Sequence, residues 1–140
     1  MSDRIFLDTN LFVYAVDDSG SGKGTVARDV ILESLQKKTG VVSHQVIQEF
    51  VNVTTHKFKQ PISQKNCVLF LETYIYPMWK KLPTKELFKE GMRIQDRYQL
   101  SYYDSLIVAS ALQAKCKKLY TEDMQHGQKI DGLEIVNPFV

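Results

Sequence analysis

The apolar positions of the chain alternate between short continuous runs and stretches with the three-to-four-residue spacing of a helix. Runs of the first kind predict strands, and helical stretches separate most of them. The strands are expected at Arg4–Leu7, Val41–Val42, Met78–Leu82, Leu119–Tyr120 and Leu133–Val136. Strands that alternate with helices favour an α/β fold in which helices cover both faces of a parallel sheet.

Helix boundaries are indicated by capping residues, glycine and proline. Gly40 ends one helical stretch, and Gln60–Pro61 separates the two that follow it. No repeat, low-complexity tract or linker divides the sequence, so residues 1–140 are expected to form a single domain. The helices are expected at Leu11–Val16, Thr25–Lys38, Ser43–Phe58, Ser63–Tyr74, Thr84–Tyr98 and Ser101–Lys115.

Composition says little about function but narrows the expected location. The 140 residues are 44% hydrophobic and 24% charged, as in ordinary globular proteins. The net charge of +2 does not by itself indicate a protein that binds nucleic acid. No segment resembles a signal peptide or a membrane span, and Cys67 and Cys116 form no metal or redox motif. We therefore expect a cytoplasmic protein with reduced thiols and no membrane association.

Two aspartates follow predicted strands. Asp8 comes directly after the first strand, and Asp123 comes shortly after the strand Leu119–Tyr120. In parallel sheets the ligand crevice lies at the carboxyl ends of the strands, so both side chains are expected there. A helix cap for Asp8 and a turn residue for Asp123 are the structural alternatives.

Two further acids lie on predicted helices. Glu49 falls at the edge of the apolar arc of its helix, where it either borders a crevice or is a solvated flank residue. Asp104 is in the first turn of a helix that is apolar nearly all round and is therefore expected to be mostly buried. It can also form a capping box with Ser101, because the two residues are three positions apart.

The acids favour metal chemistry when they are considered together. Carboxylates that lie close together repel one another unless a cation neutralises them, and oxygen ligands suit Mg²⁺ or Mn²⁺. His44, His56 and His126 are scattered and form no zinc motif. A hard cation held by carboxylates can activate water and stabilise the displacement at a phosphodiester.

Four stretches contain these acids and lie on the expected elements. They are Ile5–Asn10 (IFLDTN), Ser43–Phe50 (SHQVIQEF), Tyr103–Ala111 (YDSLIVASA) and Leu119–Met124 (LYTEDM). In this order they resemble the PIN-domain family, in particular the toxin-like (VapC-like) ribonucleases of bacterial and archaeal toxin–antitoxin pairs. The resemblance covers essentially the whole chain, because Gly132–Phe139 is also similar to the last strand of the family.

The resemblance implies a three-layer α/β/α fold with a short parallel sheet and a site for Mg²⁺ or Mn²⁺. The implied catalytic and metal-binding residues are Asp8, Glu49, Asp104 and Asp123. Asn10 and Thr121 match positions that line the same pocket. The implied activity is endonucleolytic hydrolysis of RNA, with a homodimer and inhibition by a cognate antitoxin as further expectations.

Two other functions remain open at this point. A non-catalytic interaction module could keep the PIN fold without the chemistry. A phosphatase of the haloacid-dehalogenase kind also begins with an aspartate at a strand end, but it needs a second acid where this chain has Asn10.

Residues other than the acids give weaker indications. Lys57, Lys59 and Lys80 are candidates for holding an RNA backbone. Tyr102–Tyr103 are expected to be packing residues rather than platforms for bases.

Overall fold

A twisted sheet lies at the centre of the computed structural model, which describes residues 3–17 and 21–140. Within this described part the sheet has five strands in the order β2-β1-β3-β5-β4. All neighbouring pairs are parallel except β4 with β5, which is antiparallel. The strands are β1 (Ile5–Leu7), β2 (Gly40–Val41), β3 (Lys118–Tyr120), β4 (Lys129–Ile130) and β5 (Leu133–Val136).

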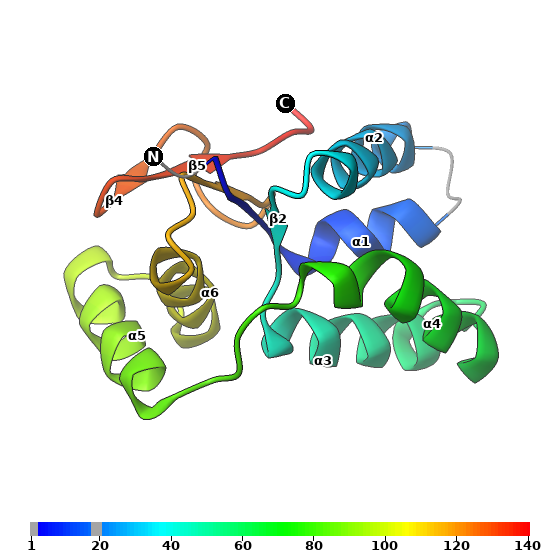
Figure 1. Cartoon of the computed structure of the whole chain (residues 1–140), viewed down its shortest axis with the longest axis horizontal. Helices are drawn as coiled ribbons and strands as arrows, with labels where there is room; N and C mark the ends of the chain where they lie inside the picture. The colour runs from blue at the N-terminus through cyan, green and yellow to red at the C-terminus, as the bar shows by residue number, and fades with distance from the viewer. Residues whose placement is uncertain (1–2, 18–20) are drawn as a thin grey trace.

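Helices cover both faces of this sheet and complete a three-layer α/β/α fold. Figure 1 shows α5 and α6 packed together on one side of the strands, with α1 and α2 on the other side. Short π-helical turns, Val53–Lys57 and Leu71–Ile75, continue α3 and α4, and a 3₁₀ turn follows at Tyr76–Met78. The α-helices are α1 (Thr9–Val16), α2 (Lys23–Gln36), α3 (His44–Asn52), α4 (Gln64–Phe70), α5 (Lys85–Tyr98) and α6 (Tyr102–Gln113).

The central strand β1 brings distant parts of the sequence together. Phe6 pairs with Val41 of β2 on one side and with Leu119 of β3 on the other, and all three side chains are buried. The same register pairs Leu7 with Tyr120, and the backbone N–H of Asp8 donates to the carbonyl oxygen of Tyr120 over 3.0 Å. The residues that follow β1 and β3 are therefore neighbours at one edge of the sheet.

Capping residues set the start of two helices at this edge. Asp8 is the N-cap of α1, and its Oδ1 accepts from the backbone N–H of Thr9 over 2.8 Å. This cap begins α1 two residues before the helix expected from the sequence. Ser101 is the N-cap of α6, and its hydroxyl accepts from the N–H of Asp104 over 3.1 Å. Both capping alternatives are therefore confirmed, and capping leaves the carboxylates able to serve a second role.

The structure corrects one expected strand and adds another. The segment Met78–Leu82 is not a strand, because it begins in a 3₁₀ turn and contributes only an isolated bridge between Trp79 and Val42. The short strand β4 was not expected from the sequence. It joins β5 through Asp131 and Gly132, which both have positive φ (48° and 87°), the geometry that an Asp-Gly hairpin turn requires.

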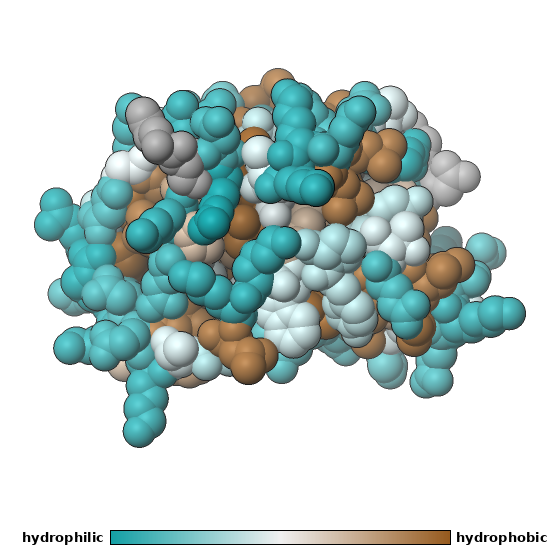
Figure 2. Space-filling view, in the orientation of Figure 1, coloured by the Kyte–Doolittle hydropathy of each residue, from teal (hydrophilic) through white to brown (hydrophobic). Residues whose placement is uncertain are grey.

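The surface in the view of Figure 2 is mostly hydrophilic, with several separate hydrophobic areas between the polar side chains. Isolated hydrophobic areas of this kind are usual on folded proteins. None of the helices in the described ranges has the length and apolar character required to cross a bilayer.

Candidate metal centre

Asp8 lies at the floor of the candidate site and is only 4% exposed. Its two carboxylate oxygens have different partners: Oδ1 accepts from the backbone N–H of Thr9, and Oδ2 accepts from the hydroxyl of Thr121 over 2.8 Å. The pKa of Asp8 is raised to about 7, chiefly because the group is buried and to a smaller extent because of the nearby charges of Asp123 and Glu49, while the hydrogen bonds from Thr121 and Thr9 oppose the rise. A buried carboxyl group in this state is stabilised as an anion by any cation that approaches it.

Thr121 connects three residues of the site through one hydroxyl group. Besides donating to Asp8, its Oγ1 accepts from the backbone N–H of Asp123 over 3.1 Å and from Nδ2 of Asn10 over 3.4 Å. The same Nδ2 of Asn10 donates to Oδ2 of Asp123 over 3.2 Å. The carboxyl end of β1 and the loop after β3 are thus joined directly by side chains.

Glu49 approaches the same group from α3. It lies at the solvent-exposed rim, and its Oε1 accepts from the hydroxyl of Thr9 over 3.4 Å. Partial burial of the carboxyl group raises the pKa of Glu49, and the negative charges of Asp123 and Asp104 add to the effect. Hydrogen bonds from Gln45 and Thr9 oppose this rise.

Asp104 completes the group from the first turn of α6. Partial burial raises its pKa, the negative charge of Asp123 raises it further, and the hydrogen bond with Ser101 lowers it. Each of the four acids therefore acts electrostatically on at least one other. The structure brings together Asp8, Glu49, Asp104 and Asp123 from four separate segments of the chain.

The donor set of this acidic cluster fits a hard divalent cation. Asn10 Oδ1 is buried and has no hydrogen-bond partner among the described residues, so a cation within its reach would satisfy an otherwise costly polar atom. The carboxylates accept hydrogen bonds from neutral donors, whereas the salt bridges found in the described residues involve other acids: Glu33, Glu90, Glu122 and Asp131. Carboxylate and amide oxygens are the ligands preferred by Mg²⁺ and Mn²⁺.

The acids are near neighbours but do not yet enclose an ion. Within residues 3–17 and 21–140, no three His, Cys, Asp or Glu side chains lie together at metal-binding distances. Asp8 is fixed by its hydrogen bonds, whereas Asp123 and Glu49 lie at the exposed side of the cluster. A single ion held by three or more of these acids therefore requires their carboxylates to come closer together.

The arrangement of four acids at the carboxyl edge of a parallel sheet is accompanied by a family match. The sequence profile described as the PIN domain matches residues 5–129, which is most of the chain. The chain belongs to the PIN domain family. The comparison with curated proteins gave no match.

Solved structures share the fold of this PIN domain at low sequence identity. A toxin-antitoxin complex from Klebsiella pneumoniae contains a chain that is 19% identical, with a TM-score of 0.65 over 96% of this chain and 97% of that one. Mycobacterium tuberculosis VapC20, a toxin that cleaves the sarcin-ricin loop, is 13% identical, with a TM-score of 0.61 and coverage of 85% and 91%. VapBC2 from Rickettsia felis, solved with a DNA fragment from its promoter, is 18% identical, with a TM-score of 0.63 and coverage of 94% and 96%.

Sequence reasoning missed two residues of the PIN domain cluster, Thr9 and Gln45. Thr9 directly follows Asp8, and Gln45 lies one helical turn before Glu49, so both positions could have been marked as neighbours of an acid. The hydrogen bond from Thr9 to Glu49 depends on how α1 and α3 pack, which the sequence pattern does not give, whereas the interaction of Gln45 with Glu49 lies within α3 and follows from their spacing.

Replacing Thr121 by valine is expected to weaken Mn²⁺ binding by about 10- to 100-fold, the usual cost of losing a residue that orients a ligand. Valine keeps the shape of Thr121 but removes the hydroxyl that holds Asp8 and the loop of Asp123. Isothermal titration calorimetry with Mn²⁺ measures the effect. Thr73→Val is the matched control, because the Thr73 hydroxyl only donates to the carbonyl oxygen of Leu69 in an exposed helix. Equal affinity in both variants would show that Thr121 does not orient a ligand.

Proposed function

We propose that this PIN domain is an endoribonuclease that requires Mg²⁺ or Mn²⁺, and that it acts as the toxin of a toxin–antitoxin pair. The observation that carries the proposal is that Asp8, Glu49, Asp104 and Asp123 come from four separate segments and are linked by electrostatic interactions and side-chain hydrogen bonds. Hydrolysis of a phosphodiester is the chemistry that hard cations in such an oxygen-rich site support.

The divalent cation supplies Lewis acidity and an activated water when it is bound. Asp8 would be the fixed ligand, because both of its oxygens are already oriented by Thr9 and Thr121. Asp104 and Asp123 would be the further ligands, and the buried Oδ1 of Asn10 would be a neutral oxygen ligand if it comes within reach of the ion. Glu49, at the rim, would orient the attacking water.

The partner side of the proposal is supported by the solved structures of the same fold. The chains from Klebsiella pneumoniae and Rickettsia felis were solved in toxin–antitoxin assemblies, and Mycobacterium tuberculosis VapC20 is a toxin that cleaves the sarcin-ricin loop. For this chain we accordingly propose an RNA substrate, a protein antitoxin and a homodimer located in the cytoplasm.

The residue two positions after Asp8 disfavours the phosphatase alternative, because an aspartate nucleophile of that kind needs a second acid there. The position two residues later is Asn10, which cannot act as an acid.

The test is cleavage of single-stranded and structured RNA by the purified protein in Mg²⁺, in Mn²⁺ and in excess chelator. We expect internal cleavage with either ion and none in chelator. The melting temperature is followed in parallel with millimolar Mn²⁺, because an ion that binds the native state raises it. Cleavage that persists in chelator would refute the metal requirement. A melting temperature that rises with Mn²⁺ while RNA stays intact would favour the non-catalytic module.

A further inference from the structure

Tyr103 is an exposed aromatic residue directly beside the acidic cluster. Tyr102 and Tyr103 are expected from the sequence to be packing residues. This expectation is wrong for Tyr103, which is 67% exposed, whereas Tyr102 is 37% exposed. Their rings make an edge-to-face contact with centroids 5.4 Å apart. Tyr103 immediately precedes Asp104, so this exposed ring is covalently adjacent to a proposed metal ligand.

The backbone at Tyr103 is fixed relative to the acids. Its carbonyl oxygen accepts a hydrogen bond from Nε2 of Gln45 over 3.2 Å. Gln45 also hydrogen-bonds to Glu49, so one side chain connects α6 to the acid on α3. The Ser101 cap holds the first turn of α6 on the other side of Tyr103. The exposed ring therefore projects from a well-fixed part of the helix rather than from a loose loop.

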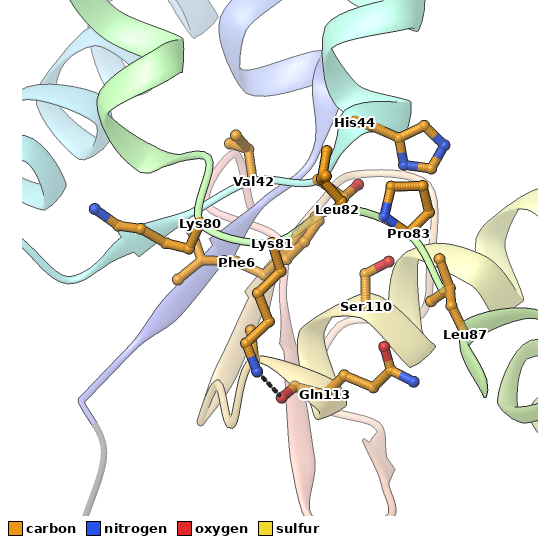
Figure 3. A pocket seen from close by; sticks show the side chains of 13 residues that line it. Phe6, Val42, His44, Lys80, Lys81, Leu82, Pro83, Leu87, Ser110 and Gln113 are labelled. Atoms are coloured by element: carbon orange, nitrogen blue, oxygen red, sulfur yellow. Dashed lines mark hydrogen bonds between the residues drawn. The ribbon is translucent and has the colours of Figure 1, made fainter. Parts of the chain in front are cut away.

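The face of α6 that carries Tyr103 continues into a small cavity. Ser110 and Ala114 lie seven and eleven residues after Tyr103, which places the three residues on one stripe of the helix. Ser110 and Ala114 line a cavity of about 30 Å³, together with residues from the start of α3 and from the segment 80–83. Figure 3 shows this cavity, with Leu82 and Pro83 facing Ser110.

The rim of that cavity is basic. Of its lining residues in the described chain, His44, Lys80 and Lys81 have basic side chains and none is acidic. Lys80 and Lys81 donate to backbone carbonyl oxygens at the surface, and Figure 3 shows the bond from Lys81 to Gln113. The exposed ring of Tyr103 thus lies between the negative cluster and a positive rim. An aromatic ring beside basic side chains is the combination that holds the bases and the backbone of a single strand.

We infer that Tyr103 is a stacking platform for one base of the RNA strand next to the bond that is cut. This inference rests on the proposed nuclease function and adds a residue that contacts the substrate. Unpaired bases stack on exposed aromatic rings with little dependence on sequence. A base on Tyr103 positions the adjoining phosphate toward Asp104, and the strand then continues toward His44 and Lys80. Paired strands cannot offer a base face to the ring, so the platform selects unpaired RNA.

The experiment measures binding of a short mixed-sequence single-stranded RNA, labelled internally with 2-aminopurine, to wild type, Tyr103→Ala and Tyr103→Phe. Chelator is present, so that binding is observed without cleavage. Alanine is expected to weaken binding by roughly 5- to 100-fold and to abolish the quenching of 2-aminopurine fluorescence that stacking causes. Phenylalanine keeps the ring and is expected to retain both signals. With metal added, alanine should raise KM much more than it lowers kcat.

The matched control is Tyr76→Ala, because Tyr76 is also an exposed tyrosine (43%) but packs against Trp79 in the 3₁₀ turn. It should bind RNA like the wild type. Circular dichroism and thermal melting check that each variant is folded.

A wild type that cleaves RNA while Tyr103→Ala binds RNA as tightly as the wild type would overturn the stacking platform and leave the nuclease proposal intact. Binding loss in Tyr103→Phe as large as in Tyr103→Ala would also overturn it. A wild type that neither binds nor cleaves RNA would remove the nuclease proposal and the platform with it.

Discussion

Asp104→Asn is expected to lower the rate of RNA cleavage by at least about a hundredfold, since even residues that only orient a metal ligand typically contribute 10- to 100-fold. Asparagine keeps the shape of the side chain but removes its negative charge, which is what attracts the cation. The N–H of residue 104 still reaches the Ser101 hydroxyl, so the helix cap survives the change. Single-turnover cleavage at saturating Mn²⁺ measures the loss.

The matched control for this variant is Asp96→Asn, at an exposed position near the end of α5. It makes the same chemical change on another helix and should cleave RNA at the wild-type rate. Thermal melting should show that both variants remain folded. Full activity in Asp104→Asn would remove Asp104 from the metal centre, whatever the other acids do.

The second large expected effect is a change of the free energy of unfolding with pH, in the direction opposite to the one usual for a carboxyl group. Because the pKa of folded Asp8 is about 7 and its ordinary value is 3.8, the native state binds a proton that the unfolded chain releases between these pH values. In chelator the free energy of unfolding should therefore fall as pH rises from about 4 to about 7. The limit of this loss is about 4 kcal/mol, at about 1.4 kcal/mol per pH unit.

Urea unfolding at several pH values, in chelator, tests this prediction. Asp8→Asn carries no titrating group at this position, so its stability should decline less, with the remaining decline coming from Glu49 and Asp104, and should exceed that of the wild type above pH 7. Millimolar Mn²⁺ should restore stability to the wild type more than to Asp8→Asn, because the ion binds the native carboxylate. The prediction is wrong if both proteins show the same pH dependence in chelator.

Asp131 provides an internal contrast for the same experiment. Hydrogen bonds from Arg93 and Tyr98 lower its pKa, so its contribution is present above its ordinary pKa and is lost as the solution becomes more acidic. Asp131→Asn should therefore change only the acidic end of the profile. The pKa shifts of Asp8 and Asp131 have opposite signs, because Asp8 is desolvated by burial whereas Asp131 is paired with the guanidinium of Arg93.

The sequence was sufficient to place four of the five described strands and the acids that follow two of them. Asp8 could be located because an apolar run ends at it, and a buried parallel strand has its ligand edge at that end. Asp104 could be located because the helix around it is apolar on nearly every side. In both cases a local pattern determines on which element the side chain lies.

What the sequence could not supply depends on packing between elements. The strand expected at Met78–Leu82 is apolar enough, but Pro77 and the 3₁₀ turn leave only Trp79 beside β2. The hydrogen bond from Thr9 to Glu49 depends on where α1 crosses α3, and the exposure of Tyr103 depends on what α5 leaves uncovered. By contrast, Asp131–Gly132 is a recognisable hairpin signal, so β4 could have been expected from the sequence although it was missed.

The bond between Thr121 and Asp8 joins residues 113 positions apart. During synthesis Asp8 therefore leaves the ribosome well before the threonine that orients it. Until β3 pairs with β1, Asp8 has neither its neighbour strand nor its hydroxyl donor. The acidic cluster can therefore assemble only after residue 121 has been synthesised, so the order of synthesis sets the earliest moment at which the candidate metal centre can form.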